Sequence, residues 1–297
     1  MKLRSAFTMI ELIFVIVIMG IIGKFGVEFL ARAYETFIYS TTNNRLQARS
    51  ATTLDFIASR LQHRIKDSVI VRATQAANLT ALASANPANS YLVLEWISTD
   101  IEGYRGATAP FWSGIIDTDV GVDVGASAYL QSPGTNTAAL NLQINTLSYN
   151  GSGVNNAAIY FIGANSDING YGWDGAIANQ NAAMHPISAN GVANQFVPTV
   201  GTFVGVDVYE YYKLSWTANA IVISAPDANN MSTLTFHYDY QPWAGERFDD
   251  AGTKTALLME DISTFQAISI GSIIKIQVCA KSRLIEEYSL CKEKTIY

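Results

Sequence analysis

Residues 5–24 read SAFTMIELIFVIVIMGIIGK, an apolar run that contains one acid, Glu11, before it ends at Lys24. As a helix, the seventeen residues from Phe7 to Gly23 would be about 25 Å long, the lower limit for crossing a hydrocarbon core of ~30 Å. An ionisable side chain within such a helix is costly and usually has a partner. The run therefore predicts a membrane-spanning helix in which Glu11 has a specific function.

The composition of the whole chain argues against several functional classes. The 297 residues are 49% apolar and 15% charged, which excludes a disordered chain. A net charge of −6 argues against sequence-independent binding of nucleic acid, so no nucleic-acid partner is expected. Two cysteines and three scattered histidines supply neither a disulfide scaffold nor a four-ligand zinc site. No G-x-S-x-G, Walker or H-E-x-x-H motif is present, so we expect no enzyme, cofactor or metal site.

Two ordinary interpretations of the N-terminus are possible. A secretory signal peptide has the same order of basic, apolar and small residues, and 31–33 (Ala-Arg-Ala) offers a small-x-small cleavage site. However, charged and bulky residues at 24–29 separate the apolar run from that site. A plain membrane anchor is the second interpretation, but it leaves Glu11 unexplained. Lys2 and Arg4 precede the run, so the positive-inside rule places the C-terminal bulk outside the membrane.

A third interpretation is a resemblance to a known family. Residues 5–13 (SAFTMIELI) resemble the cleavage and methylation motif of type IV pilin-like proteins, in which a small residue, usually glycine, precedes Phe-Thr-Leu-Ile-Glu-Leu. The resemblance implies that prepilin peptidase cuts between Ala6 and Phe7 and methylates the new Phe7 amine. It also implies that Glu11 pairs with the N-terminal amine of a neighbouring pilin or pseudopilin subunit. Loss of the leader, residues 1–6, would change the net charge from −6 to −8.

The pattern of apolar residues predicts one long helix with two halves. Residues 7–29 would be the transmembrane and assembly half, held in the inner membrane by a single pass before assembly. Residues 30–72 would be an amphipathic half, because Leu54, Ile57, Leu61 and Ile65 form one apolar stripe. The helix is expected to run to near Val69, with a solvated face formed by Arg45, Arg49, Arg60, Arg64 and Lys66. Residues 53–61 (TLDFIASRL), followed by 65–68 (IKDS), also resemble the J-type minor pseudopilin and the corresponding minor pilins.

Residues 73–297 are expected to form a periplasmic or extracellular β-rich head, which makes the fold α+β with a mainly antiparallel sheet. Residues 73–90 look like a linker, and long loops are expected around 99–201. A hairpin turn is expected at 270–273 (IGSI). The predicted strands are 91–98, 138–147, 157–163, 202–216, 220–224, 232–240, 262–270, 273–279 and 287–297.

Cys279 and Cys291 lie twelve positions apart near the C-terminus. Because the head is expected outside the membrane, an oxidised pair is the natural interpretation, and pilin-like proteins often carry such a disulfide. Two free buried thiols remain the alternative.

Weaker patterns have mainly structural explanations. Residues 167–174 space oxygen ligands as a calcium loop does, but Tyr171 and Ala178 occupy positions five and twelve, so a turn cluster is favoured. Residues 117–123 are a weaker case of the same kind. The spacing of Gly20, Gly23 and Gly26 fits either close helix packing or local loosening of the helix. Most aromatic residues of the head are expected to belong to its core.

The sequence thus favours a structural subunit, a minor pilin or pseudopilin that initiates or caps a type IV pilus or a type II secretion pseudopilus. The alternative is a tip adhesin of a type IV pilus that binds a surface or glycan through the loops around 99–201.

Overall fold

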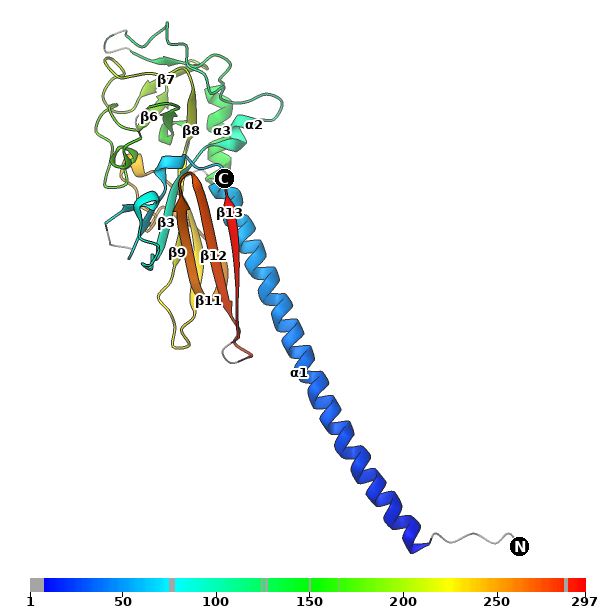
Figure 1. The fold of residues 1–297 in the computed structure, drawn as a ribbon. Helices are drawn as coiled ribbons and strands as arrows, with labels where there is room; N and C mark the ends of the chain where they lie inside the picture. The colour runs from blue at the N-terminus through cyan, green and yellow to red at the C-terminus, as the bar shows by residue number, and fades with distance from the viewer. Residues whose placement is uncertain are drawn as a thin grey trace.

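The computed structural model describes residues 8–74, 78–123, 125, 128–149, 151–164, 166–285 and 288–297. Its longest element is a 53-residue helix, α1 (Met9–Leu61), followed by a β-rich head (Figure 1). At 1.5 Å per residue the helix is about 80 Å long. Its N-terminal half points away from the head and its C-terminal half lies along it. This arrangement confirms the expected α+β layout with a long apolar helix at the N-terminus.

The head contains two antiparallel sheets and two further α-helices, α2 (Ile101–Arg105) and α3 (Thr137–Leu147). In the eight-stranded sheet the strand order is β13-β12-β11-β10-β9-β3-β1-β2, and in the five-stranded sheet it is β4-β7-β6-β5-β8. All strand pairs of the described residues are antiparallel. The strands are β1 (Ile70–Arg72), β2 (Thr80–Ala81), β3 (Val93–Ser98), β4 (Leu130–Gln131), β5 (Ala158–Phe161), β6 (Met184–Ala189), β7 (Gln195–Pro198), β8 (Tyr212–Ser215), β9 (Thr217–Ile223), β10 (Ser232–Tyr240), β11 (Lys254–Ile270), β12 (Ile273–Lys281) and β13 (Ser289–Ile296).

The five-stranded sheet belongs to an insertion between two neighbouring strands. The chain leaves the eight-stranded sheet at the end of β3, and it returns as β9, which pairs with β3. Residues 99–216 therefore form an inserted lobe, which holds α2, α3 and the strands β4 to β8. In Figure 1 this lobe forms the end of the head remote from the N-terminus. The segment around 99–201, expected to consist of long loops, is thus mostly a folded unit.

Strands β3 and β9 of the eight-stranded sheet are buried on both faces. On β3, Leu94 and Trp96 face the core under α1, whereas Val93 and Ile97 face the core shared with the inserted lobe. The two-residue period of a strand sends alternate side chains to these two cores. A third core lies within the lobe, where α3 packs through Leu140 and Ile144. The packed half of α1 and part of the inserted lobe therefore cover opposite faces of the eight-stranded sheet, and α2 of the lobe also contacts the end of α1 through Glu102 and Arg60.

The end of α1 differs from the prediction of a helix over 30–72 that reaches Val69. The helix ends at Leu61, and β1 follows after a short 3-10 turn. Val69 and Val71 join the core under α1, whereas Ile70 joins the opposite core, an alternation that a strand provides and a helix does not.

The predicted solvated face of α1 was wrong at one residue. Arg64 is 3% exposed. Its guanidinium donates hydrogen bonds to the carbonyl oxygens of Leu61 at 2.9 Å and Ser272 at 2.6 Å. Arg64 therefore ties the end of α1 to the hairpin between β11 and β12.

The predicted strand over 138–147 was also wrong, because these residues belong to α3. Alternating apolar residues suggested a strand there, but the buried side chains are Thr137, Leu140 and Ile144, which follow the helical period. Asn136 caps this helix, its side-chain oxygen accepting the N–H of Ala139 at 3.0 Å.

Most other predicted strands are present with shifted ends. The predicted strand over 202–216 shrinks to β8, and the 287–297 strand begins at Ser289 as β13, residue 287 lying outside the described residues. The turn at 270–273 is confirmed, since Ile270 pairs with Ile273 and Gly271 has a φ of 60°. The strands that sequence reasoning missed are β1, β2, β4, β6 and β7.

Candidate assembly site

The first thirty described residues of the chain, Thr8 to Phe37, are all exposed. Within them, large apolar side chains such as Phe14, Phe25 and Phe29 are 63%, 65% and 71% exposed. A continuous apolar surface of this size on a folded protein marks a contact with lipid or with another protein. One 18-residue window of α1 has a mean hydropathy of 2.3 and none of it is buried, so this helix is long and apolar enough to cross a membrane.

Packing on the head begins abruptly in the second half of α1. The buried residues of the helix are Thr42, Leu46, Ser50, Thr53, Leu54, Ile57, Ala58 and Leu61. Their spacing of three and four residues defines one face, which lies on β11, β12 and β13. Helix α1 therefore has an exposed N-terminal part and a packed C-terminal part, and the buried face begins at Thr42, twelve residues after the predicted start of the amphipathic half at residue 30.

Glu11, the predicted assembly residue, lies in the first turn of α1. Its Oε2 accepts hydrogen bonds from the backbone N–H and the hydroxyl of Thr8, both at 3.2 Å. A carboxylate in this position is stabilised by the N-terminal end of the helix dipole. The ion pairs of the described residues do not include Glu11, so within this part of the chain its charge has no counter-ion. Ala6 and Phe7, the predicted cleavage and methylation residues, lie outside the described residues.

Three glycines lie on the exposed half of α1. A Cβ added to Gly20, Gly23 or Gly26 would meet no atom within 4 Å. Packing within the described residues therefore gives no reason for glycine at these positions. Close packing at these glycines would require a neighbouring helix.

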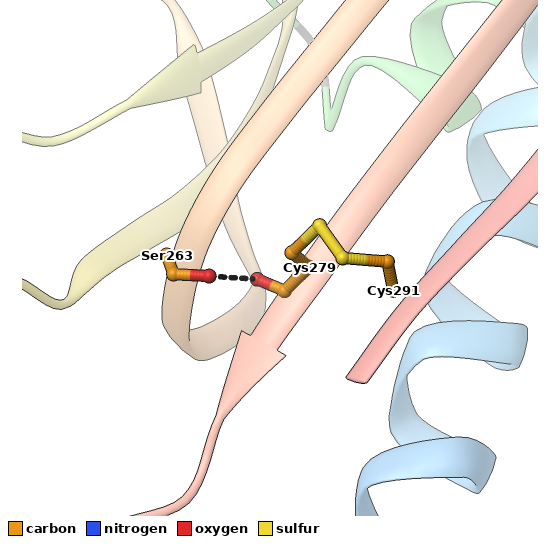
Figure 2. The surroundings of a disulfide bond; sticks show 3 residues. All are labelled: Ser263, Cys279 and Cys291. Carbon is orange, nitrogen blue, oxygen red and sulfur yellow. Dashed lines mark hydrogen bonds between the residues drawn. A yellow bond between two sulfur atoms is a disulfide. The ribbon is translucent and has the colours of Figure 1, made fainter. Parts of the chain in front are cut away.

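The predicted disulfide is present at the opposite end of the chain. Cys279 on β12 and Cys291 on β13 are directly opposite each other and form a disulfide, with their Cα atoms 3.9 Å apart (Figure 2). The hydroxyl of Ser263 on β11 donates to the carbonyl oxygen of Cys279 at 3.2 Å. The bond attaches β13, the edge strand of the sheet, to its neighbour.

Sheet-edge strand β13 also contacts the packed half of α1. The Lys294 ammonium lies 2.5 Å from an oxygen of Asp55, and the hydroxyl of Tyr288 donates to the side-chain oxygen of Asn43 at 3.0 Å. The disulfide thus stabilises the strand against which α1 rests.

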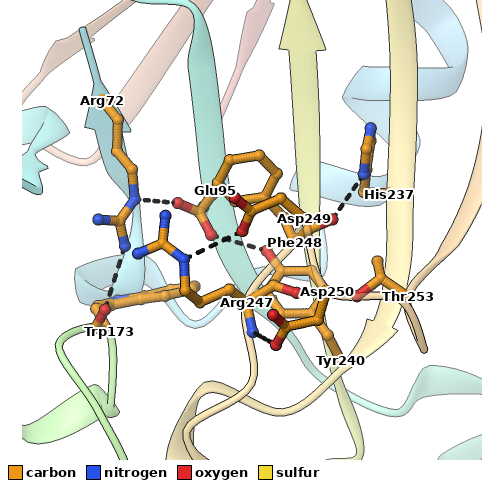
Figure 3. Close-up of polar contacts among 10 residues, drawn as sticks. All are labelled: Arg72, Glu95, Trp173, His237, Tyr240, Arg247, Phe248, Asp249, Asp250 and Thr253. Atoms are coloured by element: carbon orange, nitrogen blue, oxygen red, sulfur yellow. Dashed lines mark hydrogen bonds and ion pairs between the residues drawn. The ribbon is translucent and has the colours of Figure 1, made fainter. Parts of the chain in front are cut away.

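Sequence reasoning missed a buried charge cluster in the head (Figure 3). Arg72 on β1 lies 2.6 Å from Glu95 on β3, and these side chains are 4% and 2% exposed. Tyr240 on β10 donates to the second oxygen of Glu95 at 3.1 Å, and Arg72 also donates to the carbonyl oxygen of Trp173 at 3.2 Å. Burial raises the pKa of Glu95, while Arg72 and Tyr240 oppose that rise. The available signal was one acid inside the apolar run 93–98 (VLEWIS).

The candidate calcium loops are turns. The Asp167 carboxylate accepts hydrogen bonds from the backbone and side-chain amides of Asn169, at 3.1 and 3.0 Å, and Asp117 likewise accepts the N–H of Asp119 at 3.1 Å. Among the described residues, no group of three or more His, Cys, Asp or Glu side chains could hold a metal ion.

Fold and site together define a protein with one apolar N-terminal helix and a disulfide-linked α+β head. Comparison of the chain with models of known protein families gives no match, and neither do searches of curated proteins and of solved structures. A more specific assignment therefore depends on the chemistry of the helix and its N-terminal motif.

Proposed function

We propose that this protein is a minor pilin or pseudopilin, a structural subunit that initiates or caps a type IV pilus or a type II secretion pseudopilus. The observation that carries the proposal is the exposed half of α1, in which thirty consecutive residues, Thr8 to Phe37, are all exposed. A lipid bilayer before assembly, and the apolar helices of other pilin or pseudopilin subunits afterwards, would cover this surface.

Glu11 would give the assembly its register. Prepilin peptidase would remove residues 1–6 and then methylate the amine of Phe7. The cleavage would create this amine, which is a cation at the membrane end of the helix. A carboxylate without a cation is costly in a bilayer, so pairing of Glu11 with that amine on a neighbouring subunit would favour assembly over the isolated subunit. With Lys2 and Arg4 on the cytoplasmic side, the head would lie in the periplasm, where a disulfide is stable.

The inserted lobe supports a minor subunit over the major one. Residues 99–216 form a folded unit that packs partly on the face of the sheet opposite α1 and reaches the end of α1 through Glu102, which lies 3.6 Å from Arg60. Such a unit enlarges the head, and a large head packs poorly in the repeating shaft of a filament. The end of the filament imposes no such limit. We therefore assign the subunit a structural role at the tip or at the start of assembly, without enzymatic activity.

The proposal is tested by a change to Glu11 and a matched change to Glu28. Both acids lie in the exposed half of α1, and Glu28 already has a partner, since its carboxylate is 2.7 Å from Arg32. Glu11→Val should be cut and inserted into the membrane normally but should be absent from sheared filaments. Glu28→Gln should be incorporated as the wild type is. Incorporation of Glu11→Val at the wild-type level would refute the charge-pairing argument.

A clean deletion distinguishes the two machines. If surface pili disappear while protein secretion continues, the subunit belongs to a type IV pilus. If secreted proteins accumulate in the periplasm while pili persist, it belongs to a secretion pseudopilus. If both processes continue unchanged, the proposed function is wrong.

One observation favours a second candidate function, a tip adhesin. The inserted lobe has a core of its own and an open polar depression of about 560 Å³, whose lining includes Asp167, Asn169, Asp207 and Tyr209. Polar side chains and an aromatic ring are suited to a glycan. Asp207→Ala combined with Tyr209→Ala should then abolish attachment but leave filaments intact. Attachment at the wild-type level would exclude this depression as the receptor site.

A further inference from the structure

Asp100 lies where the inserted lobe leaves the eight-stranded sheet. It follows β3 and caps α2, its Oδ1 accepting the N–H of Gly103 at 3.2 Å. Its own backbone N–H donates to Leu214 on β8 at 2.8 Å, and its carbonyl oxygen accepts the Nε1–H of Trp112 at 3.0 Å. Asp100 is 2% exposed, and these hydrogen bonds hold it against α2, β8 and Trp112.

The side chain of Gln143, on α3, contacts this carboxyl group. Gln143 Nε2 donates to Asp100 Oδ1 at 3.1 Å. The remaining oxygens of the two side chains, Asp100 Oδ2 and Gln143 Oε1, are buried and have no hydrogen-bond partner among the described residues. Both lie beside Gly103, at 2.0 and 2.7 Å from the point where a Cβ on that residue would be. Two buried acceptors that meet without a donor are costly.

We propose that Asp100 is protonated in the folded protein under mildly acidic conditions and that its Oδ2–H donates to Gln143 Oε1. With the existing bond from Nε2 to Oδ1, this proton closes a cyclic acid–amide pair of two hydrogen bonds. Each of the four side-chain polar atoms then has a partner. The pair joins α3 to the segment through which the inserted lobe leaves β3, and Gly103 leaves room for it.

The electrostatic surroundings favour the neutral acid. Burial raises the pKa of Asp100 to about 6, and the Glu102 carboxylate adds to the rise, whereas the hydrogen bonds from Gln143, Gly103 and Trp112 lower it. Other charged or titratable groups on the elements packed around this site include Tyr104 and Arg105 on α2, Arg60 and His63 at the end of α1, and Tyr212 and Lys213 on β8. Helix α3 contributes no charged residue.

The pair makes the junction sensitive to pH. An aspartate in the unfolded chain has a pKa of about 3.9, so the folded state binds the proton more tightly. The stabilisation is complete below that value and is lost as the pH rises through about 6. Between about pH 5 and about pH 7.5, loss of this proton should lower the folding equilibrium constant about tenfold. Above pH 6, Asp100 is ionised, so it no longer donates a hydrogen bond to Gln143 Oε1 and remains as a buried carboxylate.

Asp100→Asn is the decisive variant, because an amide in place of the protonated carboxyl group donates to Gln143 Oε1 at every pH. We expect its folding equilibrium constant, measured by urea denaturation of the full-length protein in detergent, to exceed that of the wild type by about tenfold at about pH 5 and by about a hundredfold at about pH 7.5. Asp119→Asn removes an exposed carboxylate of the same lobe, so its pH dependence should match the wild type.

Two results would overturn the proposal. One is an Asp100→Asn protein that is less stable than the wild type at both pH values and keeps the pH dependence. The other comes from the wild-type protein and needs no variant to fold: an NMR titration of the side-chain carboxyl carbons in which no aspartate titrates near pH 6. The Asp100–Gln143 pair requires neither filament assembly nor the exposed half of α1, so these results are independent of the Glu11 and deletion experiments.

Discussion

The pair formed by Arg72 and Glu95 is the residue-level feature on which the centre of the head depends. Both side chains are nearly inaccessible to solvent, at 4% and 2% exposure, so either charge would be left buried if its partner were removed. Removing one partner of a buried pair typically costs about 3–5 kcal/mol. We expect Arg72→Met to lower the free energy of unfolding by about that amount, as measured by urea denaturation of the full-length protein in detergent.

Lys275 and Glu293 supply the control for that change. Their charged groups are 2.7 Å apart on neighbouring strands, but the side chains are 41% and 55% exposed, so solvent screens the interaction. Lys275→Met should change stability by about 0–1 kcal/mol. Equal effects of Arg72→Met and Lys275→Met would show that burial does not strengthen the dependence of Glu95 on its partner.

Helix α1 is continuous, but its outer half is exposed and its second half is packed on the head. The same substitution should therefore have different effects in the two halves. Ile57 is 0% exposed under the sheet, whereas Ile16 is 62% exposed on the outer half. Ile57→Ala removes buried methyl groups and should destabilise the head by about 2–5 kcal/mol. Ile16→Ala should leave the urea midpoint of the head unchanged. A similar loss in both variants would mean that the outer half contributes to the folding of the head.

The disulfide predicts a local effect at the β12–β13 edge. Cross-linking a loop this short contributes roughly 3 kcal/mol in the chain-entropy account. Replacing Cys279 and Cys291 together by Ala should reduce stability by about that amount and increase hydrogen exchange first in β13 and in the helix turns around Asp55, which Lys294 contacts. Uniform exchange across all strands would contradict the assignment of β13 as the strand that the bond holds in place.

Elements with a strong local signal could be predicted from sequence, and the others depended on tertiary contacts. The apolar run at 5–24 and the Leu54–Leu61 stripe indicate α1, and the turn at Gly271 indicates the β11–β12 hairpin. The end of α1 could not be predicted, because the apolar residues 69–71 fit a helix equally well until two separate cores exist to receive them. Strands β6 and β7 contain Pro186 and Pro198, which weaken the strand signal. The Asp100–Gln143 contact joins residues 43 positions apart and left no local pattern.

At the scale of the whole molecule, the chain has two parts. One part packs its apolar side chains into hydrophobic cores, and the other, the outer half of α1, leaves its apolar side chains exposed. The three hydrophobic cores of the described residues begin at Leu46, and no core residue precedes it. The apolar surface of the outer helix is continuous, so an aqueous solution of the full chain should associate through it. We therefore expect the outer half of α1 to determine whether the protein associates in water, and the packed half to contribute to the folding of the head.

Removal of residues 1–36 tests this separation directly. The fragment that begins at Phe37 keeps the buried face of α1, every core, the disulfide and the Arg72–Glu95 pair. We expect it to be monomeric without detergent and to unfold in a single transition at the same urea midpoint as the full chain in detergent. The full chain in buffer alone should form large assemblies by light scattering. A fragment that aggregates or unfolds at a lower midpoint would show that the outer helix supports the head, and it would contradict the proposal that this half of α1 serves only contacts with the membrane and with neighbouring subunits.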